Sequence, residues 1–396
     1  MKGLFWRILL LATLTFAKPY VLLISWDGFR WDYPDKGDFS ALKYMQENGV
    51  RAQSLQPVFP SKTFPNHYSL VTGMYPARHG MIFNSFTDPR TGIFYSTRRK
   101  TKNGLFPTDW YRGEPIWITA RRNGIKSASV FWVGTEVIDK QRRPDYFEFY
   151  NHYMPHETRI AKILEHLQRP RAERPHFLSL YFSDTDDYGH KFGPDSREIP
   201  RAIRKLDQSL GRIFRGIEEI GLADSVNIIL VSDHGMTETS PQRVVPVDSL
   251  LSGLEYTVNG SGQVSSFLAD AGTVDRIEKR LRAYGRGFNL YRRDNIPAYY
   301  HFSGHPAIGP LVLIADPGWY LRIKFPLSSR GAHGYDNRFL EMHGIFMAMG
   351  PAFKKHYRTG MLRNIDVYPL MCHILGIRPN PDMDGELIKI MHVLKQ

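Results

Sequence analysis

Three apolar runs in this chain, each typical of a buried strand, lead directly into acidic or histidine residues. These residues are Asp27 in YVLLISWDG, Asp186 and His190 in HFLSLYFSDTDDYGH, and Asp233 and His234 in NIILVSDHG. The carboxyl ends of parallel strands share one edge of a sheet, where ligands bind, so we expect these side chains to converge. His333, in GAHGYDN, precedes a further apolar run and could reach the same edge.

Carboxylates and imidazoles gathered in one cleft require a compensating positive charge, because neighbouring carboxylates raise one another's pKa. Aspartate and histidine without thiolate suit zinc, and in two-metal hydrolases the ions lie about 4 Å apart and bind the attacking and leaving oxygens. The only cysteine, Cys372, excludes a cysteine zinc site and a disulfide framework. The pattern therefore predicts a divalent metal centre, with Asp184 and Asp187 as alternatives to Asp186.

A nucleophile is predicted in the segment PVFPSKTFPNHYSLVTGMYP. Thr63 lies there between Lys62 and Phe64, and its hydroxyl becomes a useful nucleophile when a metal or a base lowers its pKa. A helix N-cap is the alternative role for Thr63, and the two are compatible because a helix N-terminus also favours phosphate. Asn84, in GMIFNSF, could donate to a developing phosphoryl oxyanion, although an ordinary turn asparagine is an equal alternative.

The elements that must position these residues are typical of an α/β protein. Strands are predicted at 20–25, 127–133, 176–182, 227–232 and 344–349. Apolar residues at steps of three or four from Ile199 to Ile220 predict one long helix that ends at Gly221. Shorter helices are predicted at 40–47, 158–167, 274–284 and 365–375. We expect a central, mostly parallel sheet with helices on both faces, and a small inserted subdomain at about 239–330.

The N-terminus and the charge balance indicate an exported protein. Residues 1–17 combine Lys2 and Arg7 with a short apolar run and small residues at the end, which predicts a signal peptide and a mature catalytic domain at 18–396. The chain has 52 Lys+Arg and 39 Asp+Glu, a net charge of +13, and removal of those two cations leaves +11. No later segment predicts a membrane span. With a single thiol, a periplasmic or secreted location is expected.

The motifs together resemble the nucleotide pyrophosphatase/phosphodiesterase family of the alkaline phosphatase superfamily, in the form of a single catalytic domain as in bacterial members. The matching blocks, in the family's order, are LLISWDGFRWDY, PVFPSKTFPNHYSLVTGMYPARHGM, NSFTDP, YNHYMPHETRI, SLYFSDTDDYGHKFGPDS, ILVSDHGM and HGYDN. The resemblance implies an alkaline phosphatase-like fold and two zinc ions. One ion would be held by Asp186, His190 and His333, and the other by Asp27, Asp233, His234 and Thr63.

The resemblance also implies a double displacement. Thr63 would attack the phosphorus of a phosphodiester or phosphoanhydride, and hydrolysis of the nucleotidyl-threonine would release a nucleoside 5′-monophosphate, with Asn84 contacting the non-bridging oxygen. Substrate-binding positions implied by the match are Lys62, Phe64, Trp132, Tyr150 and Tyr181. Aromatic rings are suited to that task because base stacking contributes about 1–3 kcal/mol and tolerates different bases.

Three other functions compete with this expectation. A phosphomonoesterase or a choline-phosphodiester hydrolase could use the same metal core. A basic polyanion-binding protein is the non-enzymatic alternative. Its basic pairs, such as Arg98-Arg99 and Arg292-Arg293, are dispersed through the chain, which is typical of solvated surface, so we expect no stable nucleic-acid partner. The preferred substrate and the oligomeric state are left open by the sequence.

Overall fold

The computed structural model describes residues 19–97, 104–323 and 325–396. The predicted signal peptide at 1–17 lies outside these residues. Within the described part of the chain, no helix combines the length and the hydrophobicity that crossing a membrane requires.

The centre of the fold is an eight-stranded sheet with the order β19-β2-β18-β9-β1-β8-β6-β7. Its strands are β19 (Tyr357–Thr359), β2 (Gly49–Ala52), β18 (Phe346–Met349), β9 (Val226–Val231), β1 (Tyr20–Trp26), β8 (Phe177–Phe182), β6 (Ser127–Val130) and β7 (Tyr146–Glu148). Most neighbours pair in parallel, whereas β18 runs antiparallel to both β9 and β2. The predicted α/β class with a mostly parallel central sheet is confirmed.

Burial explains why the central strands form where they do. All residues of β1 and β9 are buried, so their continuous apolar runs suit a sheet that is covered on both faces. The strand predicted at 127–133 is too long, because β6 ends at Val130 and Phe131 adopts a φ of 68°. That backbone conformation ends the pleat and directs the following residues away from the sheet.

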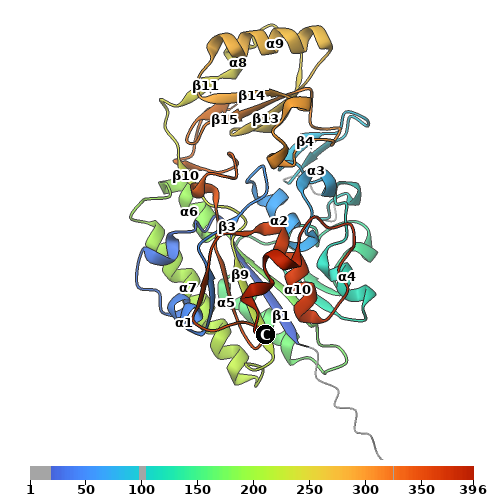
Figure 1. Ribbon diagram of the computed structural model, residues 1–396, viewed down its shortest axis with the longest axis vertical. Helices are drawn as coiled ribbons and strands as arrows, with labels where there is room; N and C mark the ends of the chain where they lie inside the picture. The colour runs from blue at the N-terminus through green and yellow to red at the C-terminus, as the bar shows by residue number, and fades with distance from the viewer. Residues whose placement is uncertain (1–18, 98–103, 324) are drawn as a thin grey trace, which may run out of the picture.

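Helices cover both faces of this sheet (Figure 1). One face carries α1 (Ser40–Asn48), α5 (His156–Gln168) and α7 (Ile199–Glu219), and the other carries α2 (Thr63–Thr72), α4 (Ile116–Arg122) and α10 (Val367–Leu375). In α7, the buried residues recur at helical spacing, including Ile199, Ile203, Leu206, Leu210 and Ile213. The long amphipathic helix predicted from the sequence is therefore confirmed, and it packs its apolar stripe on the sheet.

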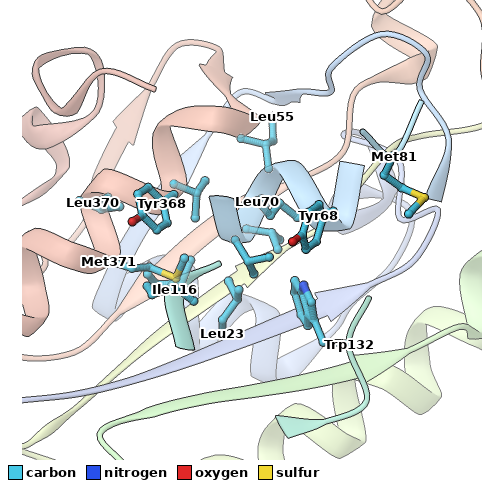
Figure 2. Close-up of a cluster of buried hydrophobic side chains, with 14 of the residues drawn as sticks. Leu23, Leu55, Tyr68, Leu70, Met81, Ile116, Trp132, Tyr368, Leu370 and Met371 are labelled. Carbon is cyan, nitrogen blue, oxygen red and sulfur yellow. The ribbon is translucent and has the colours of Figure 1, made fainter. Parts of the chain in front are cut away.

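Figure 2 shows the apolar cluster beneath α2. Leu70 of α2, Leu23 of β1 and Leu370 of α10 belong to one core and are fully buried. Each leucine of this kind contributes about 1.5–3 kcal/mol by its removal from water. Because α2 packs in one core with β1 and α10, the N-terminus of α2 has a fixed place at the edge of the sheet.

A second, four-stranded sheet stands above the central one, in the upper part of Figure 1. Its order is β12 (Thr257–Ser261), β13 (Val264–Leu268), β15 (Leu311–Ala315), β14 (Phe288–Arg292), and all of its pairings are antiparallel. The helices α8 (Val247–Leu250) and α9 (Ala271–Tyr284) pack with it around Phe267, Ile277 and Leu313. The chain leaves through β10 (Thr237–Glu238) and returns through β17 (Gly331–Ala332), which pair with each other. The predicted subdomain boundaries of 239–330 stay a prediction.

The remaining short elements join these layers. They are β3 (Leu55–Gln56), α3 (Pro76–His79), β4 (Ser85–Thr87), β5 (Phe94–Ser96), α6 (Asp184–Phe192), β11 (Val244–Pro246), β16 (Tyr320–Arg322) and β20 (Leu362–Arg363). Of these, α6 follows β8 after a single residue and therefore begins at the edge of the central sheet.

Candidate active site

The residues expected to converge do meet at one edge of the central sheet. Asp27 follows β1 directly, Asp233 follows β9 after one residue, and α6 carries Asp186 from the end of β8. The antiparallel strand β18 begins where β9 ends, since Phe346 pairs with Val231. The residues that precede β18 therefore lie at the carboxyl edge of the parallel strands, and the short strand β17 places His333 there.

Asp27, Asp233 and His234 form one half of the cluster. His234 Nε2 lies 3.0 Å from Asp233 Oδ2 and 3.3 Å from Asp27 Oδ1. All three side chains are buried. The chain turns tightly directly after Asp27. Gly28 has a φ of 65°, and a Cβ at this position would lie 2.9 Å from the Cα of Asp186. Only glycine fits this approach without strain.

Asp186, His190 and His333 form the other half. Asp186 and His190 are four residues apart on α6, which places them on the same face of the helix. Asp186 Oδ1 lies 3.4 Å from His190 Nε2 and 3.6 Å from His333 Nε2. Asp184 and Asp187, the alternatives to Asp186, point elsewhere: Asp184 pairs with His156 and Lys205, and Asp187 accepts a hydrogen bond from Ser183.

The two halves meet at His234, whose ring stacks on the His333 ring with centroids 3.6 Å apart. Among the described residues, two sets have ligand atoms that all lie within 4.8 Å of one another and could each hold a metal ion: Asp186, His234 and His333, and Asp27, His67 and Asp233. His234 thus neighbours both halves, and the carboxylates that lie within 4 Å of its Nε2 are those of Asp233 and Asp27. The division of the ligands between two ions that the resemblance implies stays a prediction.

The donor atoms of this cluster fit metal ions. Asp27 Oδ1, Asp186 Oδ1 and Asp233 Oδ2 are buried and have no hydrogen-bond partner. The Nδ1 atoms of His190, His234 and His333 donate to the carbonyl oxygens of Gly331, Gly235 and Ser61. Because a carbonyl can only accept, Nε2 has a free lone pair whenever the ring is neutral, which is the arrangement of a metal-ligating histidine.

The electrostatics of the protein alone indicate a missing positive charge. Burial, followed by the charges of Asp233 and Asp186, raises the pKa of Asp27 well above its ordinary range. Burial also raises the pKa of Asp186 to about 7. Burial opposes the charged form of His234, but Asp233 overcomes it and raises the pKa of His234 to about 9. Divalent cations would replace these protons and allow the carboxylates to be charged.

Thr63 lies beside this cluster as the first residue of α2, with its Oγ1 3.2 Å from His234 Nε2. Asn66, one turn further along, holds the preceding loop: its Oδ1 accepts from Val58 N at 2.7 Å, and its Nδ2 donates to the carbonyl oxygens of Pro60 and Lys62. The carbonyl oxygen of Ser61 in this loop also accepts a hydrogen bond from His333 Nδ1. The threonine hydroxyl is therefore fixed relative to both the helix and the cluster.

Lys62 and Asn84 flank the threonine. Lys62 Nζ donates to Gln263 Oε1 at 2.5 Å, which connects the loop before Thr63 to the upper sheet. Burial lowers the pKa of Lys62 to about 8, and the charge of Asp186 opposes this shift. Asn84 Oδ1 accepts from the backbone nitrogen of Phe64 at 3.3 Å, so the asparagine side chain lies at the positive N-terminus of α2.

A cavity of about 250 Å³ opens next to Thr63. Four of the five predicted substrate-binding residues line it, namely Phe64, Trp132, Tyr150 and Tyr181, whereas Lys62 lies outside it. The other lining residues are Thr63, Thr97, Phe106, Phe131, Val133, Gly134 and Glu136. The walls are largely aromatic, and one of the lining residues, Thr63, contacts His234 of the Asp/His cluster through its hydroxyl.

A comparison with models of known families identifies the chain. Residues 21–336 match the family described as type I phosphodiesterase / nucleotide pyrophosphatase. The chain belongs to this family. The resemblance deduced from the motifs is thereby confirmed, and the α/β architecture agrees with that of solved structures of the family.

Curated relatives of the phosphodiesterase family cover nearly all of the chain. It is 36% identical to human ectonucleotide pyrophosphatase/phosphodiesterase family member 5 over 364 residues, which are 91% of this chain and 75% of that protein. It is 34% identical to the bovine bis(5′-adenosyl)-triphosphatase over 368 residues, or 92% of this chain and 80% of that protein. Human family member 1 is 35% identical over 96% of this chain, but the chain spans only 42% of its length.

Solved structures of the phosphodiesterase family give the same result. The murine family member 5, as an inactive threonine-to-alanine variant in complex with AMP, superposes with a TM-score of 0.90 at 34% sequence identity. The match covers 95% of this chain and 100% of that chain. The human family member 5 has the same TM-score and identity.

His67 is the residue of this site that the sequence interpretation missed. Its ring is fully buried, its Nδ1 donates to Thr63 O at 2.9 Å and lies 3.3 Å from Asp233 Oδ2, and its Nε2 pairs with Ser25 Oγ. A signal was present in the sequence, because Thr63 and His67 are four residues apart, which is the spacing that places two residues of a helix such as α2 on one face. Both ring nitrogens have protein partners, which suits a residue that positions the cluster.

Proposed function

We propose that this chain is an exported two-zinc phosphodiesterase that hydrolyses phosphodiester or phosphoanhydride bonds of nucleotides and releases nucleoside 5′-monophosphates. The observation that carries this proposal is the place of Thr63, which lines the aromatic cavity and whose hydroxyl lies 3.2 Å from His234 Nε2. A phosphate bound next to Thr63 would lie close to the nucleophilic hydroxyl. The Asp/His cluster, which would hold the metal ions, lies on one side of this position, and the apolar cavity, which would take the base, lies on the other.

Each half of the cluster would hold one zinc ion. One ion would be bound by Asp27, Asp233 and His234 together with Thr63, and the other by Asp186, His190 and His333. When bound, such ions act as Lewis acids that stabilise charge on the phosphoryl oxygens and lower the pKa of the threonine hydroxyl. Zinc is proposed because the ligands are imidazole and carboxylate without thiolate. The buried, unpartnered oxygens of the three aspartates support this assignment.

The residues of the chain would then carry out two displacements. Thr63 Oγ1 forms a bond to phosphorus while the bond to the leaving oxygen breaks, and the hydroxyl proton of Thr63 ends on the leaving oxygen, which gives a nucleotidyl-threonine. Water then attacks the same phosphorus, the bond to Thr63 breaks, one proton of the water returns to Thr63 Oγ1, and the nucleoside 5′-monophosphate leaves. The N-terminus of α2 and the side chain of Asn84, which lies beside it, would contact a non-bridging oxygen in both steps.

The nucleoside is proposed to occupy the aromatic cavity. Phe64 and Tyr150 would stack on the base, while Trp132 and Tyr181 form the inner walls. The relatives support this class of substrate: one solved structure of murine member 5 holds AMP in an inactive threonine-to-alanine variant, and another relative is a bis(5′-adenosyl)-triphosphatase. Lys62 Nζ, which already contacts Gln263, would neutralise part of the phosphate charge.

Phe64→Ala separates a nucleotide diesterase from the alternatives. We expect KM for a nitrophenyl ester of thymidine 5′-monophosphate to rise about 10-fold, because loss of a stacked ring costs about 1–3 kcal/mol. Turnover of nitrophenyl phosphate, which places no base in the cavity, should be unaffected. Phe339→Ala, which removes a half-exposed ring outside the cavity, serves as the control.

Steady-state kinetics on three substrates complete this test. The nucleotide diester should be the best substrate, ahead of nitrophenyl phosphate and nitrophenyl phosphocholine. A preference for the monoester would favour the phosphomonoesterase, and a preference for phosphocholine would favour the choline-phosphodiester hydrolase. Binding to DNA that weakens steeply with salt, without zinc and without turnover, would favour the polyanion-binding protein.

A further inference from the structure

Tyr181 has a hydrogen bond that a role in base stacking does not explain. Its ring lines the aromatic cavity and packs edge-on against the His67 ring, with centroids 5.3 Å apart. Its hydroxyl donates to Asp27 Oδ2 at 2.7 Å. One side chain therefore joins the wall of the cavity to a carboxylate of the Asp/His cluster.

This hydrogen bond divides the two oxygens of Asp27. Oδ2 is held by Tyr181, whereas Oδ1 is buried without a hydrogen-bond partner and lies 3.3 Å from His234 Nε2. The backbone of Asp27 is fixed as well, because its nitrogen donates to Phe182 O at 2.9 Å and its carbonyl accepts from Thr185 Oγ1 at 2.6 Å. The carboxylate can still rotate about χ2, a torsion that has a broad distribution in aspartate. The hydrogen bond from the Tyr181 hydroxyl restricts this rotation.

We propose that Tyr181 is a positioning residue that orients Asp27 for metal binding. This inference rests on the metal centre of the proposed function and adds to it a contact between the substrate cavity and the metal site. Hydrogen bonds to a ligating carboxylate fix its direction and its charge, and their loss costs about 10–100-fold in metal affinity. The other cavity tyrosine differs in this respect, because the Tyr150 hydroxyl pairs with His152 Nδ1 at 3.2 Å.

Tyr181→Phe tests the proposal while the ring and its packing are kept. Zinc affinity and stoichiometry are measured by titration of the metal-free full chain in competition with a chelating dye. We expect the wild-type protein and the matched control Tyr150→Phe to bind two zinc ions with equal affinity. Tyr181→Phe should bind one of its two ions about 10–100-fold more weakly and the other ion normally.

A double-mutant cycle with Asp27→Asn separates positioning from a general effect on folding. If the hydroxyl acts through Asp27, Tyr181→Phe should add nothing to the loss of zinc affinity already caused by Asp27→Asn. A Tyr181→Phe protein with a lower unfolding temperature or a higher nucleotide KM, but with wild-type affinity for both zinc ions, would overturn the proposal. A wild-type chain that binds no zinc would instead contradict the metal centre itself, and this inference with it.

Discussion

Replacing Thr63 with alanine is expected to lower kcat for nucleotide diesters by about 10⁴-fold or more, because the residue that would form the bond to phosphorus is removed. The side chain is half-buried at the start of α2, and the loop before it is held by Asn66, so the fold should be retained. AMP should still bind, since the aromatic cavity and the aspartate and histidine ligands are unchanged. Steady-state kinetics with a nitrophenyl nucleotide ester, together with calorimetric titration of AMP, measure both effects.

Thr63→Ser is the matched control for this variant. It keeps a hydroxyl 3.2 Å from His234 and should retain a measurable rate and the covalent intermediate. Quenched reactions analysed by peptide mass spectrometry should show a nucleotidyl group on residue 63 in the serine and threonine proteins only. Activity of Thr63→Ala within tenfold of the wild type would exclude Thr63 as the nucleophile.

Removal of the metal is the second change with a large expected effect. A zinc chelator should abolish turnover and lower the unfolding temperature, and addition of zinc should restore both. Buried carboxylates explain the expected loss of stability. Without cations their charged form is unfavourable, as shown by burial raising the pKa of Asp186 to about 7 and also raising that of Asp27. An ion present at 100 times its Kd stabilises the folded chain by about 2.7 kcal/mol, which calorimetry can detect.

Two aspartates of α6 provide a matched pair for the metal experiment. Asp186→Asn removes a carboxylate whose Oδ1 faces His190 and His333, so zinc content measured by elemental analysis should fall. Asp184→Asn removes a carboxylate of the same helix that pairs with Lys205, and zinc content should stay at the wild-type value. Full turnover after complete removal of zinc would contradict the proposed chemistry.

The sequence predicts the parts of this site that depend on local order. Asp27, Asp186 and Asp233 each follow an apolar strand, so the rule for the carboxyl edge of parallel strands is enough to place them together. Asp186 and His190 share a helical face for a similar reason. The segment around Thr63 indicates a nucleophile, and the family resemblance adds the four aromatic residues, which line one cavity.

Contacts between distant segments are not accessible in the same way. His333 reaches the site because β18 runs antiparallel to β9. The sequence of β18 is equally compatible with a parallel strand, so it does not predict this direction. The hydroxyl of Tyr181 meets Asp27 across two neighbouring strands, in a register that only the paired sheet defines. The place of His234 between both halves of the cluster likewise depends on how three strands and α6 pack together.

The most direct test of a two-metal phosphodiesterase site is a crystal structure of Thr63→Ala with zinc and AMP, with anomalous scattering at the zinc edge. We predict two anomalous peaks, one among Asp27, Asp233 and His234 and one among Asp186, His190 and His333. The phosphate of AMP should lie at the N-terminus of α2, with adenine between Phe64 and Tyr150. A single peak, or AMP bound away from residue 63, would contradict the account.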